Sequence, residues 1–173
     1  MPVIMSTLNL WKAIGGSGPL PPRGKGIVSN SRLGAWCGNV AAFPEGDFVV
    51  AMNELTYTTL VFRLVPVPAF IASFSFSLGM QLAEIGAGQE VIELETKALF
   101  DELLFRKNDN RSLLGSLNDV CFHVGWHLHE SARCNPETIL SIQRRLNEMP
   151  HVHHEPSVPN DGLRLVFHAD GEA

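Results

Sequence analysis

The chain has 173 residues, a formal net charge of -5 and a sequence pI near 5.8. This length suits a single domain that can bury a hydrophobic core. The acidic balance argues against a protein that binds duplex nucleic acid, because Lys and Arg contacts to phosphates supply most of that affinity.

The first half of the chain predicts a strand-rich region. Residues 8–14 form a short apolar segment, either a strand or a helical turn, and the Gly- and Pro-rich residues 15–26 form a loop. Residues 33–43 and 48–52 read as two strands of a hairpin, with turn residues at 44–47. Residues 57–65 are rich in β-branched and aromatic side chains, so we expect a third strand there.

The uncharged run at 64–83 approaches the length of a membrane span. Its prolines and serines instead favour a buried or half-buried helix of a soluble protein. Pro68 fits the first turn of this helix, which should end near Gly86 or Gly88. A short helix around 90–97 and a strand at 100–106 follow. Pro136 opens a last helix, which ends at about residue 149.

The clearest element is a helix from about residue 110 to residue 129. Asp109 or Asn110 can cap it by accepting backbone N–H groups of the first turn. Gly115 indicates either the close approach of another group or a tolerated surface glycine. Apolar side chains at spacings of three and four form a stripe that faces a core: Leu113, Leu114, Leu117, Val120, Cys121, Val124 and Leu128. The opposite, polar face carries Ser112, Ser116, Asp119, His123, His127 and Glu130.

These elements predict an α+β fold with a small, mainly antiparallel sheet covered by about three helices. We expect one domain over residues 1–154 and a tail over 155–173. The tail contains a predicted edge strand at 162–168 and a frayed acidic end. His151, His153 and His154 are interpreted as part of a polar, flexible stretch.

Three short stretches resemble a bacterial family, the domain of unknown function 6933: Leu33–Asn39, Asn53–Thr56 and Asn110–Asp119. The last stretch is the most specific, and the resemblance covers about residues 33–151. It implies a common fold and a common surface rather than a reaction. The matching positions that would carry this surface are Trp36, Asn39, Asn53, Glu54, Asn110, Arg111, Ser112, Ser116, Asn118 and Asp119.

The start of the central helix is the best candidate for a binding site. Backbone N–H groups, the Arg111 guanidinium and the Ser112 hydroxyl meet there, which suits a carboxylate or phosphate of a partner. If the fold also brings Trp36, Asn39, Asn53 and Glu54 to this point, they would form one polar recess. In the structural alternative, Asn110 only caps the helix, Arg111 pairs with an acid and Trp36 belongs to the core.

Catalytic and metal sites have weaker support. Glu54 and Asp119 as paired carboxylates, with Arg111, would suit a phosphate-handling hydrolase or nuclease. Asp119, His123 and His127 have a spacing that suits a metal, but a solvated helix face explains it better, and we expect neither metal nor cofactor. The sequence contains neither a GxSxG nor an HExxH motif.

We therefore expect a cytosolic binding or accessory protein that recognises a protein or a small anionic partner, rather than an enzyme. The hydrolase or nuclease is the first alternative. A toxin–antitoxin or phage-defence component, which the small size permits, is the second. The three cysteines have no CxxC spacing and the N-terminus has no secretory pattern, so a reducing, cytoplasmic location is expected. The sequence gives no indication of the oligomeric state.

Overall fold

The computed structural model describes residues 2–22, 31–67, 69–101, 103–131, 133–152 and 154–168. Five strands form one sheet in the order β4-β3-β2-β1-β5. They are β1 (Val3–Ser6), β2 (Ala35–Phe43), β3 (Gly46–Asn53), β4 (Thr59–Arg63) and β5 (Leu104–Lys107). The helices are α1 (Leu8–Ala13), α2 (Ala69–Glu84), α3 (Gln89–Asp101), α4 (Arg111–Glu130), α5 (Pro136–Glu148) and α6 (Pro159–His168). The predicted α+β class is confirmed.

The sheet is mixed rather than mainly antiparallel, and six helices lie in the described ranges instead of the expected three. Strands β2, β3 and β4 pair antiparallel, as the hairpin pattern predicts. Strand β1 lies between β2 and β5 and is parallel to both. All four residues of β1 are buried, so the strand has no alternation of polar and apolar side chains by which it could be recognised.

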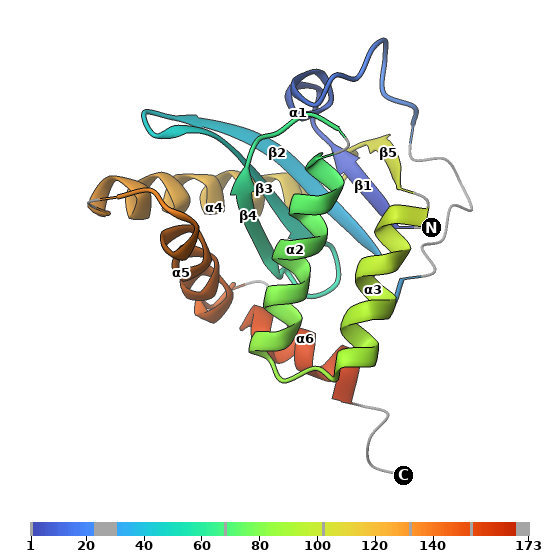
Figure 1. Ribbon diagram of the computed structural model, residues 1–173, viewed down its shortest axis with the longest axis vertical. Coiled ribbons are helices and arrows are strands. Elements are labelled where there is room, and N and C mark those ends of the chain that lie inside the picture. Colours follow the sequence, from blue (N-terminus) through green and yellow to red (C-terminus); the bar gives the residue numbers. More distant parts are fainter. Residues whose placement is uncertain are drawn as a thin grey trace.

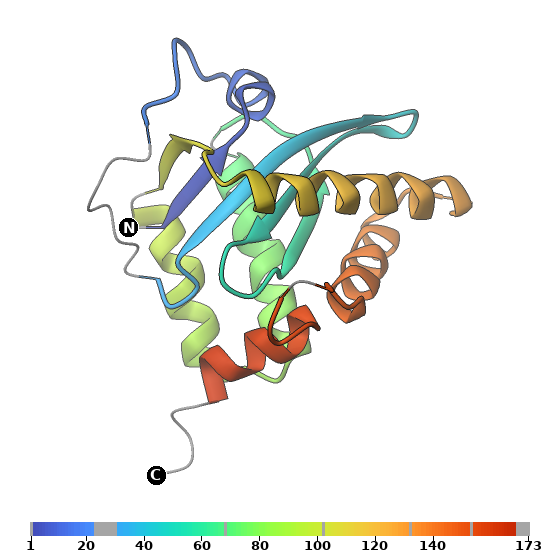
Figure 2. The ribbon, with the colours of Figure 1, turned by 180° about the vertical axis from the view of Figure 1, so that it is seen from behind.

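The helices cover both faces of the sheet, which gives three layers (Figures 1 and 2). Helices α1, α2, α3 and α6 lie on one face, and α4 runs across the other face with α5 beside it. Successive strand residues point to opposite faces. Ile4 and Trp36 therefore join the core beneath α2, whereas Met5 and Cys37 join the core beneath α4.

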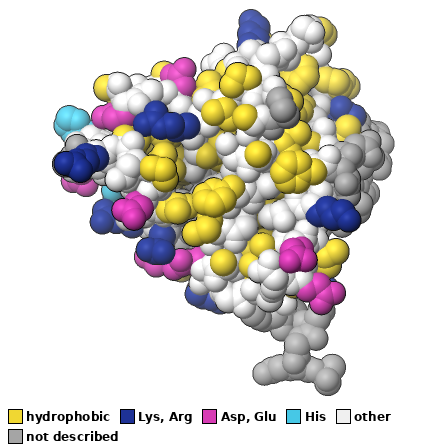
Figure 3. All heavy atoms as spheres, in the orientation of Figure 1, with side chains coloured by type: hydrophobic (Ala, Val, Ile, Leu, Met, Phe, Trp, Pro, Cys, Tyr) yellow, Lys and Arg dark blue, Asp and Glu magenta, His cyan; other side chains and the backbone are white. Residues whose placement is uncertain are grey.

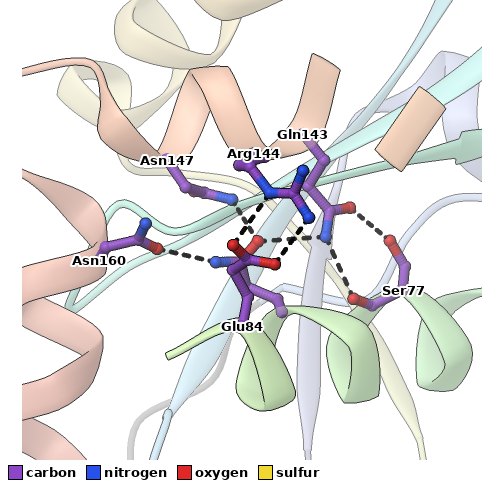
Figure 4. A network of polar contacts seen from close by, with 7 residues as sticks. Ser77, Glu84, Gln143, Arg144, Asn147 and Asn160 are labelled. Carbon is purple, nitrogen blue, oxygen red and sulfur yellow. Dashed lines mark hydrogen bonds and ion pairs between the residues drawn. The ribbon is translucent and has the colours of Figure 1, made fainter. Parts of the chain in front are cut away.

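Helix α5 also covers the outer edge of β4. The Val61 N–H donates to Gln143 Oε1 at 3.0 Å, and the Thr59 N–H donates to Asn147 Oδ1 at 2.7 Å. Asn147 Nδ2 donates back to the Thr59 carbonyl at 2.8 Å. The buried network is completed by Ser77, Gln81 and Asn160, and Figure 4 shows it beside the exposed Arg144–Glu84 ion pair. These amides take the place of a neighbouring strand and fix α5 against the sheet.

The C-terminal stretch is part of the domain, and the predicted edge strand at 162–168 is wrong. Residues 159–168 form helix α6, which Pro159 opens. Leu163 and Phe167 are four residues apart and are buried in the core beneath α2. Leu165 would share their face in a strand, but it is 62% exposed. Packing therefore selects the helical spacing over the alternating one.

Several element boundaries also differ from the prediction. Residues 8–13 are helical, which decides between the two readings of that segment. Helix α3 continues to Asp101, so β5 begins at Leu104 rather than at Phe100. Pro68, residues 23–26 of the predicted loop and the acidic end after 168 lie outside the described residues. Of the helices that the structure describes, none is both long and apolar enough to span a membrane.

Candidate functional site

The turn between β3 and β4 holds Tyr57 in an unusual backbone conformation. Tyr57 has a φ of 59°, in the left-handed region that side chains other than glycine rarely adopt. The buried Asn53 Oδ1 accepts hydrogen bonds from the N–H groups of Leu55 and Thr56, both at 3.0 Å. The Tyr57 N–H donates to the Asn53 carbonyl at 3.1 Å. The turn is thus fixed by its own polar groups, and it presents the tyrosine ring toward the helices.

Two histidines that follow α5 pack on this ring. The ring of His154 stacks on Tyr57 at a centroid distance of 4.1 Å, and the ring of His151 meets it edge-on at 5.3 Å. The Nε2 atoms of both histidines are buried and have no hydrogen-bond partner among the described residues. The interpretation of residues 151–154 as a flexible polar stretch is therefore wrong for His151 and His154, and His153 lies outside the described residues.

The polar face of α4 stands opposite this segment and encloses a cavity of about 340 Å³, which we call the α4 recess. Ser112, Ser116, Asp119 and His123 form the helix wall, because spacings of three and four place side chains on one face. Residues 149–152 form the second wall, and Tyr57 also lines the cavity. The described lining residues are Tyr57, Ser112, Ser116, Asp119, Val120, His123, Met149, Pro150, His151 and Val152.

The electrostatics of the α4 recess are set by one carboxylate and two imidazoles. Burial lowers the pKa of His151 below its ordinary value of 6.5, and the nearby His154 and His123 lower it further. His151 is therefore neutral at pH 7. Among the described lining residues, Asp119 is the only one of the Asp, Glu, Lys and Arg types. The recess combines hydroxyl, imidazole and carboxylate groups with the apolar surfaces of Val120 and Met149.

A second polar cavity, of about 490 Å³, continues along α4 toward its C-terminus. His127 lines it one helical turn after His123, and Arg145 and Ser141 of α5 line the other side. Burial lowers the pKa of His127; Arg145 and His123 lower it too, and Glu130 opposes them. The predicted polar stripe of α4 thus borders two cavities, although Ser112, Asp119 and Glu130 on it are also exposed to solvent.

The N-terminus of α4 is capped as predicted, and its cap contacts one of the expected strand-region residues. Asn110 Oδ1 accepts from the Leu113 N–H at 3.1 Å. Asn110 Nδ2 donates to Glu54 Oε1 at 3.3 Å. Glu54 therefore lies at the helix start, as the sequence predicts.

Cys37 lies beneath this helix start but is not a reactive thiol. Asn108 Nδ2 donates to Cys37 Sγ. Burial, followed by the nearby Cys121 and Glu54, raises the pKa of Cys37 to about 12. Thiol nucleophilicity requires the thiolate, so Cys37 is a structural side chain at neutral pH.

Trp36, Asn39 and Asn53 make contacts that stabilise the fold. Trp36 is 1% exposed and packs edge-on against Phe74 on the face of the sheet opposite to α4. Asn39 Oδ1 accepts from Thr7 Oγ1 at 2.8 Å. The Asn53 amide is used within its own turn and by the Leu33 carbonyl, which accepts from Nδ2 at 2.7 Å. Trp36 therefore does not share a recess with Arg111, and the Asn53 amide is used within its own turn.

Arg111, Asn118 and Gly115 lie on the outward side of α4. All three are exposed, and none lines the α4 recess. A Cβ atom built on Gly115 would have no neighbour within 4 Å. Of the two alternatives for Gly115, the structure therefore supports the tolerated surface glycine over the close approach of another group. Asp119 follows Asn110, the partner of Glu54, by nine residues, or about 13 Å along the helix axis. Glu54 and Asp119 are therefore too far apart to act as one carboxylate pair.

Tyr57, Met149 and His151 line the recess although the sequence analysis did not select them. Tyr57 was expected to begin a strand, and a single tyrosine carries no pattern of its own. One feature of the sequence does point to the packing of Tyr57 and His151. The chain has a single tyrosine and places three histidines directly after Pro150, and rings of this kind pack on one another. Within the described ranges, no three His, Cys, Asp or Glu side chains are grouped as a metal site would require.

Comparison with known proteins gives one match. A family model described as "Domain of unknown function (DUF6933)" matches residues 3–161. The chain belongs to this family. The match is wider than the resemblance at residues 33–151, because it includes β1, the Gly- and Pro-rich loop and the start of α6. No curated protein and no solved structure matches the chain.

Proposed function

We propose that this DUF6933 protein is a binding protein that holds a small, uncharged, hydroxyl-rich molecule in the α4 recess. The observation that supports this best is the convergence of polar groups from three separate segments on one cavity. Tyr57, Ser112 and Ser116 supply hydroxyl groups, Asp119 supplies a carboxylate, and His123 and His151 supply imidazoles. A volume of about 340 Å³ lies within the usual range of small-molecule sites.

The charge of the recess favours an uncharged ligand over an anion. Asp119 repels an anion at neutral pH, and the neutral His151 does not compensate. The expectation of an anionic partner rests on Arg111, which is exposed on the outward side of α4. Anion binding at Arg111 would therefore be a separate event from binding in the recess.

The mixture of lining groups fits a vicinal diol such as that of a sugar. A carboxylate accepts two hydrogen bonds at once, so Asp119 can hold two adjacent hydroxyl groups. The serine hydroxyls both donate and accept, which suits further hydroxyl groups. Val120 and Met149 offer apolar surface to the C–H side of such a ligand. Specificity in sites of this kind comes from a few polar groups within an apolar frame.

The alternative functions have less support. A hydrolase that uses Glu54, Asp119 and Arg111 together would need these three groups at one place. Glu54 binds the helix cap, Asp119 lines the recess and Arg111 faces outward. For a toxin–antitoxin or defence role, we find no favouring observation in the described part of the chain.

The test is a titration with D-ribose, a small vicinal diol, followed by ¹H–¹⁵N spectra at pH 7.5. We expect saturable shifts of the Ser112, Ser116 and His123 amides. Asp119→Ala should weaken binding at least about tenfold, because hydrogen bonds to a charged group contribute roughly 1.5–3 kcal/mol. Asn118→Ala is the matched control, since it changes the neighbouring exposed residue outside the recess, and it should leave the affinity unchanged.

Two results would contradict the proposal. Equal effects of Asp119→Ala and Asn118→Ala would show that the recess is not the site. Tighter binding of inorganic phosphate than of ribose at pH 7.5, with shifts at the same amides, would show that the ligand class is wrong.

A further inference from the structure

Helix α2 is rich in apolar side chains, and some of its large ones face solvent rather than the core. Phe70 and Phe74 are fully buried, whereas Phe76 is 61% exposed and Met80 is 41% exposed. From Ala69 to Ala83 the helix carries no charged side chain. A helix that covers a sheet normally carries charged and polar groups on its outer face, and all-round apolar helices are normally buried. The outer face of α2 therefore has the composition of a covered surface.

An apolar groove of about 400 Å³ lies beside this exposed face, between α2, β4 and α5. Figure 3 shows hydrophobic side chains gathered over this face of the molecule, with the charged side chains mostly toward its margin. The groove is lined by Val61, Phe62, Arg63, Ala72, Ser73, Phe76, Ser77, Pro136, Ile139 and Leu140. Phe76 is thus both a wall of the groove and the residue that projects beside it.

We propose that this face joins two copies of the chain in a two-fold symmetric dimer, in which Phe76 of each copy enters the groove of the other. In a two-fold interface the same patch serves both partners, so it must contain a projection and a matching hollow. The exposed Phe76 and the neighbouring groove meet this condition on one face. A two-fold axis that lies between Phe76 and the groove, roughly parallel to α2, would place the Phe76 of each copy in the groove of the other.

The charge distribution also favours a second copy at this face. Each chain carries a net charge of -5, so two copies repel each other over most of their surface. Among the described residues that line the groove, Arg63 is the one charged residue and none is a carboxylate. The Arg63 guanidinium is already held by the carbonyls of Glu45 and Cys134. Two acidic chains can therefore meet here without bringing carboxylates together.

The size of the face sets the expected strength of the dimer. Helix α2 has 16 residues and is about 24 Å long, and two adjacent helices are about 20 Å wide. The patch therefore measures about 480 Å² in plan, which is less than the roughly 800 Å² per partner of a standard interface. We expect a weak, concentration-dependent dimer with a dissociation constant in the micromolar range.

Sedimentation velocity of the full chain from about 5 to 500 µM, a range that spans weak dissociation constants, tests this proposal. Wild type should shift from monomer to dimer and no further. Phe76→Asp should raise the dissociation constant at least about tenfold, as loss of a buried aromatic anchor does. The matched control is Phe122→Asp, which makes the same change at a phenylalanine of α4 that is 70% exposed, on the other side of the sheet. It should leave the dimer intact.

Ser73→Arg provides a second variant, because it fills the groove without altering Phe76. It should likewise raise the dissociation constant at least about tenfold, and thermal melts of both variants should match those of wild type. Three outcomes would overturn the proposal: a wild-type chain that stays monomeric throughout the range, equal weakening by Phe122→Asp and Phe76→Asp, or growth into species larger than dimers. Ribose binding in the α4 recess does not depend on any of these results, since α2 does not line it.

Discussion

Tyr57 illustrates how single residues define the candidate site. Its left-handed backbone costs free energy, and such strain persists only where the surroundings hold it. Asn53 supplies that support from within the turn, and His151 and His154 enclose the ring from the segment after α5. The sequence marks Asn53 as a surface residue for a partner. In the structure its amide is fully buried, and it acts on the site only by holding the turn that presents Tyr57.

Two half-buried histidines, His127 and His151, predict a loss of stability in mild acid. The pKa values of His127 and His151 in the folded chain lie below the ordinary 6.5, in each case chiefly because of burial. Below pH 6.5 the unfolded chain takes up protons that the folded chain does not, so unfolding becomes more favourable. The stability that the neutral forms of these two histidines contribute is complete above pH 6.5. It is lost as the pH falls through their lowered pKa values in the folded chain. The midpoint of urea unfolding should therefore be lower at about pH 5.5 than at about pH 7.5.

Two histidine variants test the origin of this pH dependence. His151→Gln removes one of the two half-buried groups, so it should reduce the difference between the two pH values, whatever its effect on stability at neutral pH. His129→Gln changes an exposed histidine of the same chain and should leave the difference as it is. The explanation fails if wild type is equally stable at both pH values, or if His129→Gln has the larger effect.

Helix α4 is the element on which the site is built, and its two interior glycines have opposite environments. A Cβ atom on Gly115 would meet open space, whereas one on Gly125 would lie 2.6 Å from Cε1 of Phe43. Gly115→Ala should therefore stabilise the chain by roughly 0.5–1 kcal/mol, the usual gain from replacing a helical glycine. Gly125→Ala should destabilise it by about 1 kcal/mol or more, because the Phe43 ring must move.

Urea unfolding of the two alanine variants measures this difference directly. The expected order of stability is Gly115→Ala, then wild type, then Gly125→Ala. If Gly125→Ala were as stable as Gly115→Ala, α4 would not approach the β2–β3 hairpin at Phe43, and the course of the helix across the sheet would be wrong.

At the scale of the whole molecule, local signals identified most elements but not their arrangement. Asn110 as a helix cap and the apolar stripe of α4 are features of consecutive residues, so the sequence shows them. The central position of β1 depends on pairing with β2 and β5, which are distant along the chain. The amides that cover the edge of β4 come from α5, and their role cannot be read from the α5 sequence alone.

The same contrast between local signals and contacts of distant segments explains how much of the candidate site could be predicted. Ser112, Ser116 and Asp119 repeat along one helix face, so periodicity groups them, and all three line the recess. Arg111 was selected with them, but its position on the helix turns it away from the recess. Tyr57 and His151 reach the cavity from a turn and from the end of α5. Only the packing of α5 beside α4 brings those segments together.

The most direct test of the central claim compares two adjacent tryptophan substitutions in α4. Ser116→Trp would fill the α4 recess, whereas Gly115→Trp places the same side chain in open space on the outward side of the helix. Both variants are titrated with D-ribose at pH 7.5 under the conditions used for wild type. If the recess is the binding site, Ser116→Trp abolishes the saturable shifts and Gly115→Trp retains them. Retained binding in Ser116→Trp, or equal loss in both variants, would contradict the assignment of the α4 recess as the ligand site.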